Sequence, residues 1–147
     1  MSKEKQNGSI ETHQKKKIKG VFNEYNEYIV NLLNNPKNYG KPPDEEITIS
    51  QTYKGPCGDS LFFFLKIKDD IIRKANFINE GCGCSFVAAC QTTLLIEGKS
   101  LSFAEALKPE DVDSALKGLP EDHKHCAELA IRTLRRAINK YKASLVK

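Results

Sequence analysis

Two dense apolar runs separated by a three-residue polar segment constrain the fold of this chain more than any other feature. Residues 61–67 and 71–77 have the length and composition of β-strands, and residues 68–70 indicate a short turn between them. Such a pair must be antiparallel, because parallel strands need a crossover of about a dozen residues or more. A further strand is expected over residues 47–53, with no helical segment before the next one. We therefore predict a three-stranded antiparallel sheet.

Helical periodicity marks most of the remaining sequence. Apolar residues recur at helical spacing over residues 20–34 and again from Cys126 to Leu145. Shorter helices are expected after Ser85, which we predict as an N-cap, over residues 102–109 behind a capping box that starts at Ser102, and over 110–117, closed by Gly118. This order predicts a single α+β domain in two layers, with the helices packed on one face of the sheet.

The positive charge of the chain is concentrated in its first 19 residues. The formal net charge is +4, and residues 1–19 account for it with six lysines and two glutamates. A nucleic-acid-binding domain concentrates positive charge on its folded body, so we expect no nucleic-acid partner. We predict a disordered basic tail over residues 1–19 and one domain over residues 20–147.

Five cysteines, Cys57, Cys82, Cys84, Cys90 and Cys126, occur in a chain with no apolar export signal and no apolar run of membrane-spanning length. We therefore expect a soluble, cytoplasmic protein without a membrane partner. Disulfides are rare in reducing compartments, which favours metal binding or thiol chemistry for these cysteines.

Three of the cysteines lie where predicted elements begin or end. Cys57 and Asp59 precede the second strand, Cys82 follows the third, and Cys126 begins the last helix directly after His125. The start of one antiparallel strand and the end of its partner share a sheet edge, so Cys57 and Cys82 can be neighbours there. If the last helix begins at the same edge, Cys126 and His125 complete a cluster with Asp59.

This set of side chains can hold a metal in more than one way. Three thiolates plus one oxygen or nitrogen ligand can bind Zn²⁺ tetrahedrally, and the same set can hold an iron–sulfur cluster. Thiolates near helix N-termini are stabilised by the helix dipole. The sequence leaves Cys84 undecided between this site and the core. Cys90 is expected to pack in the core, and His123 to be an exposed residue at a helix start.

Four segments are similar to the NifU/IscU-type iron–sulfur cluster assembly scaffold proteins. They read NNPKNYG, GPCGDS, FINEGCGCS and LPEDHKHCAELA, in the family's order and approximate spacing, over roughly residues 20–147. The resemblance implies a stand-alone, NifU N-terminal domain-like scaffold rather than an enzyme. A cysteine desulfurase would deliver sulfur, iron would join, and a transient 2Fe–2S cluster would form and pass to apo iron–sulfur acceptor proteins.

The same resemblance implies roles for individual residues. Cys57, Cys82 and Cys126 match the three family ligands, and Cys126 also matches the position proposed to accept persulfide sulfur. Asp59 matches the aspartate that tunes cluster lability and can bind zinc. His125 matches an alternative fourth ligand. The family's chaperone-binding loop reads Leu-Pro-Pro-Val-Lys, and the departure from it over residues 119–124 argues against recognition by the dedicated Hsp70 system.

The main alternative is a zinc-bound sulfur acceptor of a cysteine desulfurase, as in the SufU branch of the same fold. That branch carries an insertion before the last cysteine and lacks the adjacent histidine, whereas Cys82 and Cys126 are 44 positions apart here and His125 is present. A structural zinc adaptor would not explain the Cys–Asp pairing. A Cys–His hydrolase is disfavoured because adjacent helical residues point about 100° apart. Monomeric and cluster-bridged dimeric states both remain open.

Overall fold

The computed structural model describes residues 25–146, so the predicted tail and the first residues of the first predicted helix lie outside it. One antiparallel sheet has the order β1 (Ile49–Lys54), β2 (Ser60–Lys68) and β3 (Ile71–Glu80). Asp69 and Asp70, which join β2 to β3, have φ of 55° and 60°. Two central residues with positive φ make a turn whose twist matches that of paired strands. The predicted sheet and hairpin are confirmed.

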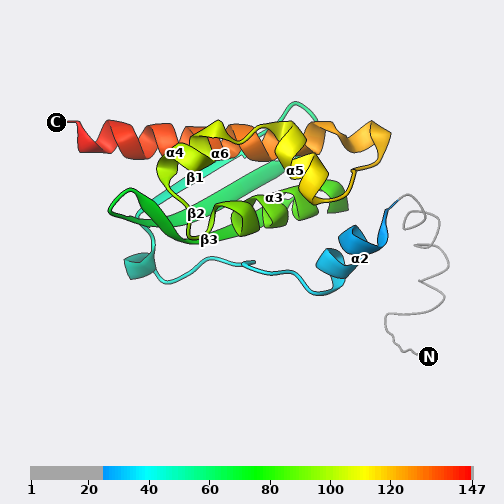
Figure 1. Cartoon of the computed structure of the whole chain (residues 1–147), viewed down its shortest axis with the longest axis horizontal. Coiled ribbons are helices and arrows are strands. Elements are labelled where there is room, and N and C mark those ends of the chain that lie inside the picture. Colours follow the sequence, from blue (N-terminus) through cyan, green and yellow to red (C-terminus); the bar gives the residue numbers. More distant parts are fainter. Residues whose placement is uncertain (1–24, 147) are drawn as a thin grey trace.

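The helices are α2 (Glu27–Asn34), α3 (Gly83–Ile96), α4 (Leu101–Ala106), α5 (Pro109–Ala115) and α6 (His125–Leu145), with 3₁₀ turns η1 (Asp44–Glu46) and η2 (Glu121–His123). Helix α3 packs against β3 and helix α6 against β1 and β2, and the two helices contact each other, which gives a helical layer on one face of the sheet (Figure 1). The predicted two-layer α+β domain is confirmed. Between residues 25 and 146, no helix has the length and apolar character needed to cross a membrane.

The core lies between the sheet and helices α3 and α6. Alternate residues of β2 face it and are buried, as are the inward residues of α6. Helix α3 is buried along most of its length because β3, α2, α5 and α6 all pack against it. Cys84 and Cys90 are completely buried in this helix, which confirms the core position expected for Cys90.

Two predicted N-caps are wrong by two or three residues. Helix α3 is capped by Cys82 and not by Ser85, since the Cys82 sulfur accepts a hydrogen bond from the Ser85 backbone N–H at 3.5 Å. Helix α4 is capped by Ser100, whose hydroxyl accepts from the Phe103 N–H at 3.1 Å, and not by Ser102. The thiol at position 82 fills a role that hydroxyl and carboxyl side chains fill most often, which misled the prediction.

Candidate functional site

One edge of the sheet brings the start of β2 next to the end of β3. Ser60 pairs with Glu80, so the residues just outside the pair, Asp59 and Gly81, face each other. A Cβ atom on Gly81 would lie 2.5 Å from the Asp59 carboxyl group, which is closer than real Cβ contacts. Glycine at position 81 therefore lets the Asp59 side chain cross the chain and reach Cys82, where Oδ2 lies 3.3 Å from Sγ.

Cys82 and Cys126 form a thiol pair at the beginnings of two helices. Their sulfurs are 3.9 Å apart, with Cys82 at the N-cap of α3 and Cys126 in the first turn of α6. The hydrogen bond from Cys126 lowers the pKa of Cys82, and a further hydrogen bond from Cys84 acts in the same direction. The same bond to Cys82, together with burial, raises the pKa of Cys126. Of the two thiols, Cys82 therefore has the lower pKa and Cys126 the higher one.

The contact between Cys82 and Asp59 favours a bound proton or cation at this place. A thiolate and a carboxylate repel each other at this distance unless a proton or a cation lies between them. Cys126 contributes a second potential thiolate to the same place. Adjacent anionic sulfur and oxygen ligands suit a transition-metal ion, which deprotonates the thiols it binds.

Cys84 supports this site from within the core. Its thiol donates a hydrogen bond to the Tyr25 hydroxyl at 3.5 Å, and its side chain is completely buried. Burial raises the pKa of Tyr25 well above its ordinary value, and the hydrogen bond with Cys84 adds to that effect. The residue that the sequence left undecided thus belongs to the core and also contacts the site residue Cys82.

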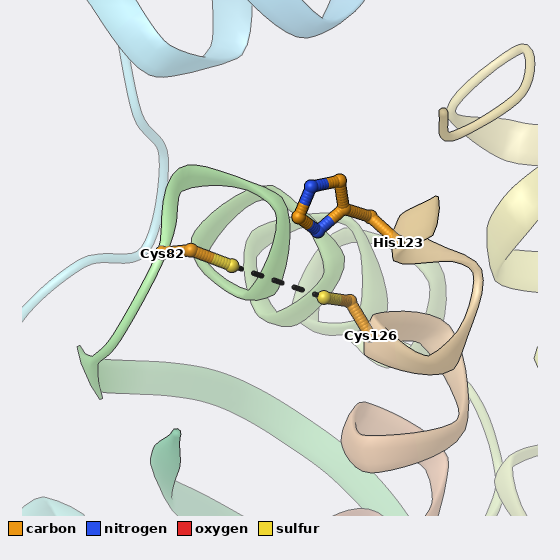
Figure 2. A group of neighbouring side chains, drawn as sticks. All are labelled: Cys82, His123 and Cys126. Atoms are coloured by element: carbon orange, nitrogen blue, oxygen red, sulfur yellow. Dashed lines mark hydrogen bonds between the residues drawn. The ribbon is translucent and has the colours of Figure 1, made fainter. Parts of the chain in front are cut away.

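His123, which we predicted to be an exposed residue at a helix start, is half-buried beside the thiol pair. Cys82, His123 and Cys126 form the only group of three or more metal-binding side chains in residues 25–146 whose ligand atoms all lie within 4.8 Å of one another. Figure 2 shows the imidazole beside the line between the two sulfurs, with one ring nitrogen facing them. We call this group the inner triangle.

A spacing signal in the sequence points to His123. Residues three apart in helical backbone lie on one face, so a His-x-x-Cys segment can present both ligands together. Lys124 between them has helical φ and ψ, and the N–H of Ala127 donates to its carbonyl at 3.2 Å. The family resemblance points only to His125, the histidine directly adjacent to Cys126.

Cys57 and His125 lie on the outer side of the same site. Cys57 is exposed in the turn before β2, where Gly58 has a φ of 96° that favours glycine. His125 is exposed at the start of α6, with Nε2 3.8 Å from the Cys126 sulfur. Both residues line an open pocket of about 400 Å³, together with Glu128 and Arg132. We call Cys57 and His125 the outer pair; the structure places them outside the inner triangle.

Comparison with known proteins assigns the chain to a family. Residues 24–147 match the family model of the NifU-like N terminal domain. The chain therefore belongs to the NifU-like N-terminal domain family, and the resemblance predicted from its motifs is confirmed.

The curated relatives are iron–sulfur cluster assembly scaffold proteins named IscU. The one from Aquifex aeolicus is 32% identical over 120 residues, covering 80% of this chain and 76% of that protein. The one from Escherichia coli K12 is 33% identical over 122 residues, covering 81% of this chain and 94% of that protein.

Solved structures share the fold at lower sequence identity. The SUF-system protein FiSufU from Fervidobacterium islandicum AW-1 has a TM-score of 0.62 at 20% identity, covering 81% of this chain and 99% of that one. A nitrogen-fixing NifU-like protein (N-terminal) from Brucella abortus has a TM-score of 0.62 at 15% identity, covering 84% of this chain and 97% of that one. These two likenesses support the predicted fold.

Proposed function

We propose that this protein is a scaffold on which a transient 2Fe–2S cluster is assembled from iron and desulfurase-derived sulfur, then passed to acceptor apoproteins. The observation that carries the proposal is the meeting of Cys82, Cys126 and Asp59 at one sheet edge, with Cys57 on the neighbouring turn. Family membership and the IscU relatives, named as iron–sulfur cluster assembly scaffold proteins, support it. In this role the protein is a carrier and not an enzyme.

The donor set suits a cluster that is held and then released. Cys57, Cys82 and Cys126 supply three thiolates of the kind that hold iron–sulfur clusters, and Asp59 supplies an oxygen. A carboxylate is a harder ligand than a thiolate and binds iron–sulfur centres less tightly, so Asp59 favours release. The same residues fit zinc in the absence of iron and sulfur.

Cys126 is the proposed acceptor of desulfurase-derived sulfur. Its thiol would pass its proton to the Cys82 sulfur 3.9 Å away, and the resulting Cys126 thiolate would attack the outer sulfur of a persulfide on the desulfurase. One S–S bond forms on Cys126 as the donor S–S bond breaks and the desulfurase thiolate leaves. Because Cys126 is completely buried, the segment around η2 must move or be displaced by the partner before this step. The proposed partners are a cysteine desulfurase and apo iron–sulfur acceptor proteins.

Anaerobic reconstitution tests the scaffold. The protein is incubated with ferrous iron, cysteine and a cysteine desulfurase, and visible absorption is recorded with iron, sulfide and zinc analysis before and after apo-ferredoxin is added. We expect a cluster chromophore that forms on the protein and then moves to the ferredoxin. Retained zinc, no chromophore and faster desulfurase turnover would overturn the scaffold in favour of a zinc-bound sulfur acceptor.

A further inference from the structure

We propose that His123 is the histidine ligand of a mononuclear metal centre formed with Cys82 and Cys126, and that His125 is not part of that centre. The centre would take a tetrahedral divalent cation, Zn²⁺ or Fe²⁺, with Asp59 against Cys82 as the fourth donor. The inference uses two thiols of the proposed cluster site and in that respect rests on the proposed function. His123 would then be a ligand at a position that we predicted to be exposed.

The state of the His123 ring supports its role as a ligand. Its Nδ1 atom is buried and has no hydrogen-bond partner among residues 25–146. A buried imidazole nitrogen without a partner loses its hydration and gains nothing in return, so such atoms are rare in folded proteins. This Nδ1 atom is the ring nitrogen that faces the two sulfurs in Figure 2. A metal ion bound between the three side chains would give it a partner.

The spacing of the donor atoms also suits one tetrahedral ion. Two sulfurs bound to one tetrahedral zinc at about 2.3 Å each lie about 3.8 Å apart. The sulfurs of Cys82 and Cys126 are 3.9 Å apart. Sulfur and imidazole nitrogen on the same ion lie about 3.6 Å apart, and the corresponding atoms here are within 4.8 Å, which a small side-chain rotation closes.

The two histidines differ in their position relative to the two thiols. Their ring centroids are 6.1 Å apart, and only His123 joins the group whose ligand atoms lie mutually within 4.8 Å. His125 is exposed and lines the pocket that also holds Cys57. Both histidines lie near Cys126, since Nε2 of His125 is 3.8 Å from its sulfur. Cys82 separates them, because of the two histidines only His123 has a ring nitrogen within 4.8 Å of both sulfurs.

Imidazole ¹⁵N spectra of the full chain test the assignment without any substitution. The apo-protein is titrated with Zn²⁺, with no iron, sulfide or desulfurase present, and the two ring nitrogens of each histidine are followed. We expect the Nδ1 resonance of His123 to shift as one equivalent binds, while both nitrogens of His125 change little. A shift of a His125 nitrogen in place of His123, or no histidine shift on binding, would overturn the proposal.

A matched pair of variants measures the size of the effect. Loss of an outer-shell partner typically lowers metal affinity by about 10–100-fold, so loss of a direct ligand in His123→Ala should lower zinc affinity by at least about 10-fold. The comparison variant His125→Ala should retain near wild-type affinity in the same chelator competition. Equal losses in the two variants, with circular dichroism showing both folded, would overturn the proposal.

These experiments distinguish a failure of the His123 assignment from a failure of the proposed scaffold. If zinc binding is independent of His123 while reconstitution and transfer succeed, the ligand assignment fails and the scaffold stands. If the Nδ1 of His123 binds zinc while no cluster forms or moves, the scaffold fails and the metal centre stands.

Discussion

The inner triangle and the outer pair lie at the same sheet edge and contrast in burial and in support. Cys82 and Cys126 are fixed by the first turns of α3 and α6, and Cys126 is completely buried. Cys57 sits in an exposed turn that depends on a positive φ at Gly58, and His125 is exposed on α6. One region is built into the core, while the other is reached from solvent.

This contrast suits a scaffold that first binds a metal ion and then completes a larger cluster. Groups fixed by packed helices keep their geometry before any ion arrives, which lowers the cost of binding the first metal. An exposed thiol on a turn can supply a further ligand to a cluster and can also be reached by a partner protein. We expect a single metal ion to need only the inner triangle and Asp59, whereas the proposed two-iron cluster would need Cys57 as well.

The largest expected effect comes from removing one inner thiol. Cys82→Ser and Cys126→Ser should each lower zinc affinity by more than about 100-fold, because a direct ligand contributes more than an outer-shell partner. Cys57→Ser should bind zinc nearly as well as the wild type and yet fail to hold a stable 2Fe–2S cluster. Chelator competition and anaerobic reconstitution measure the two properties. Loss of zinc in Cys57→Ser equal to that in Cys82→Ser would erase the distinction between the regions.

A methyl group at position 81 should disrupt the link between the strand edge and the inner triangle. Gly81→Ala places Cβ 2.5 Å from the Asp59 carboxyl group, and overpacking of this kind costs about 1–3 kcal/mol. Urea unfolding measures the loss of stability. In an Asp59→Gly background the cost should shrink, since the atoms that clash are gone. If Gly81→Ala destabilises the Asp59→Gly protein as much as the wild type, the strain does not come from contact with Asp59.

Alkylation should distinguish the thiols by access and by pKa. The thiolate is the reactive form, and an ordinary cysteine has a pKa of about 8.5. Because its pKa is lowered, Cys82 should stay reactive as the pH falls below neutrality. Cys126, buried and with a raised pKa, should react more slowly than exposed Cys57, by about tenfold or more. Timed iodoacetamide labelling with peptide mass spectrometry gives the rates, and comparable rates for Cys57 and Cys126 would contradict the assigned burial.

Asp59→Ala should have the smallest effect on cluster binding and a distinct effect on cluster release. Without the carboxylate next to Cys82 the cluster loses its hardest donor, so we expect it to persist longer and to move to apo-ferredoxin several-fold more slowly. The rate of ferredoxin formation measures transfer. Asp59→Asn serves as the matched variant that keeps the shape of the side chain. Transfer from Asp59→Ala at the wild-type rate would remove Asp59 from the release step.

Local patterns in the sequence were sufficient to predict the sheet, the hairpin, the order of the helices and the family. The turn at Asp69 and Asp70, the alternation in β2 and the helical spacing of α6 depend on residues close together in the chain. The motifs around Cys57, Cys82 and Cys126 likewise identified the candidate thiols. The start of α3 was predicted wrongly, because the thiol of Cys82 caps this helix in place of the hydroxyl of Ser85.

Which histidine faces the thiols was decided by the tertiary structure alone. His123 and His125 are two positions apart and chemically identical, and the sequence has a signal for each: the His-x-x-Cys spacing favours His123 and the family resemblance favours His125. The choice depends on how α6 docks beside α3 and on the turn at η2 that brings the His123 ring over the Cys82 and Cys126 sulfurs. Contacts between residues 44 positions apart are set by the packing of the whole core, and no local periodicity encodes them.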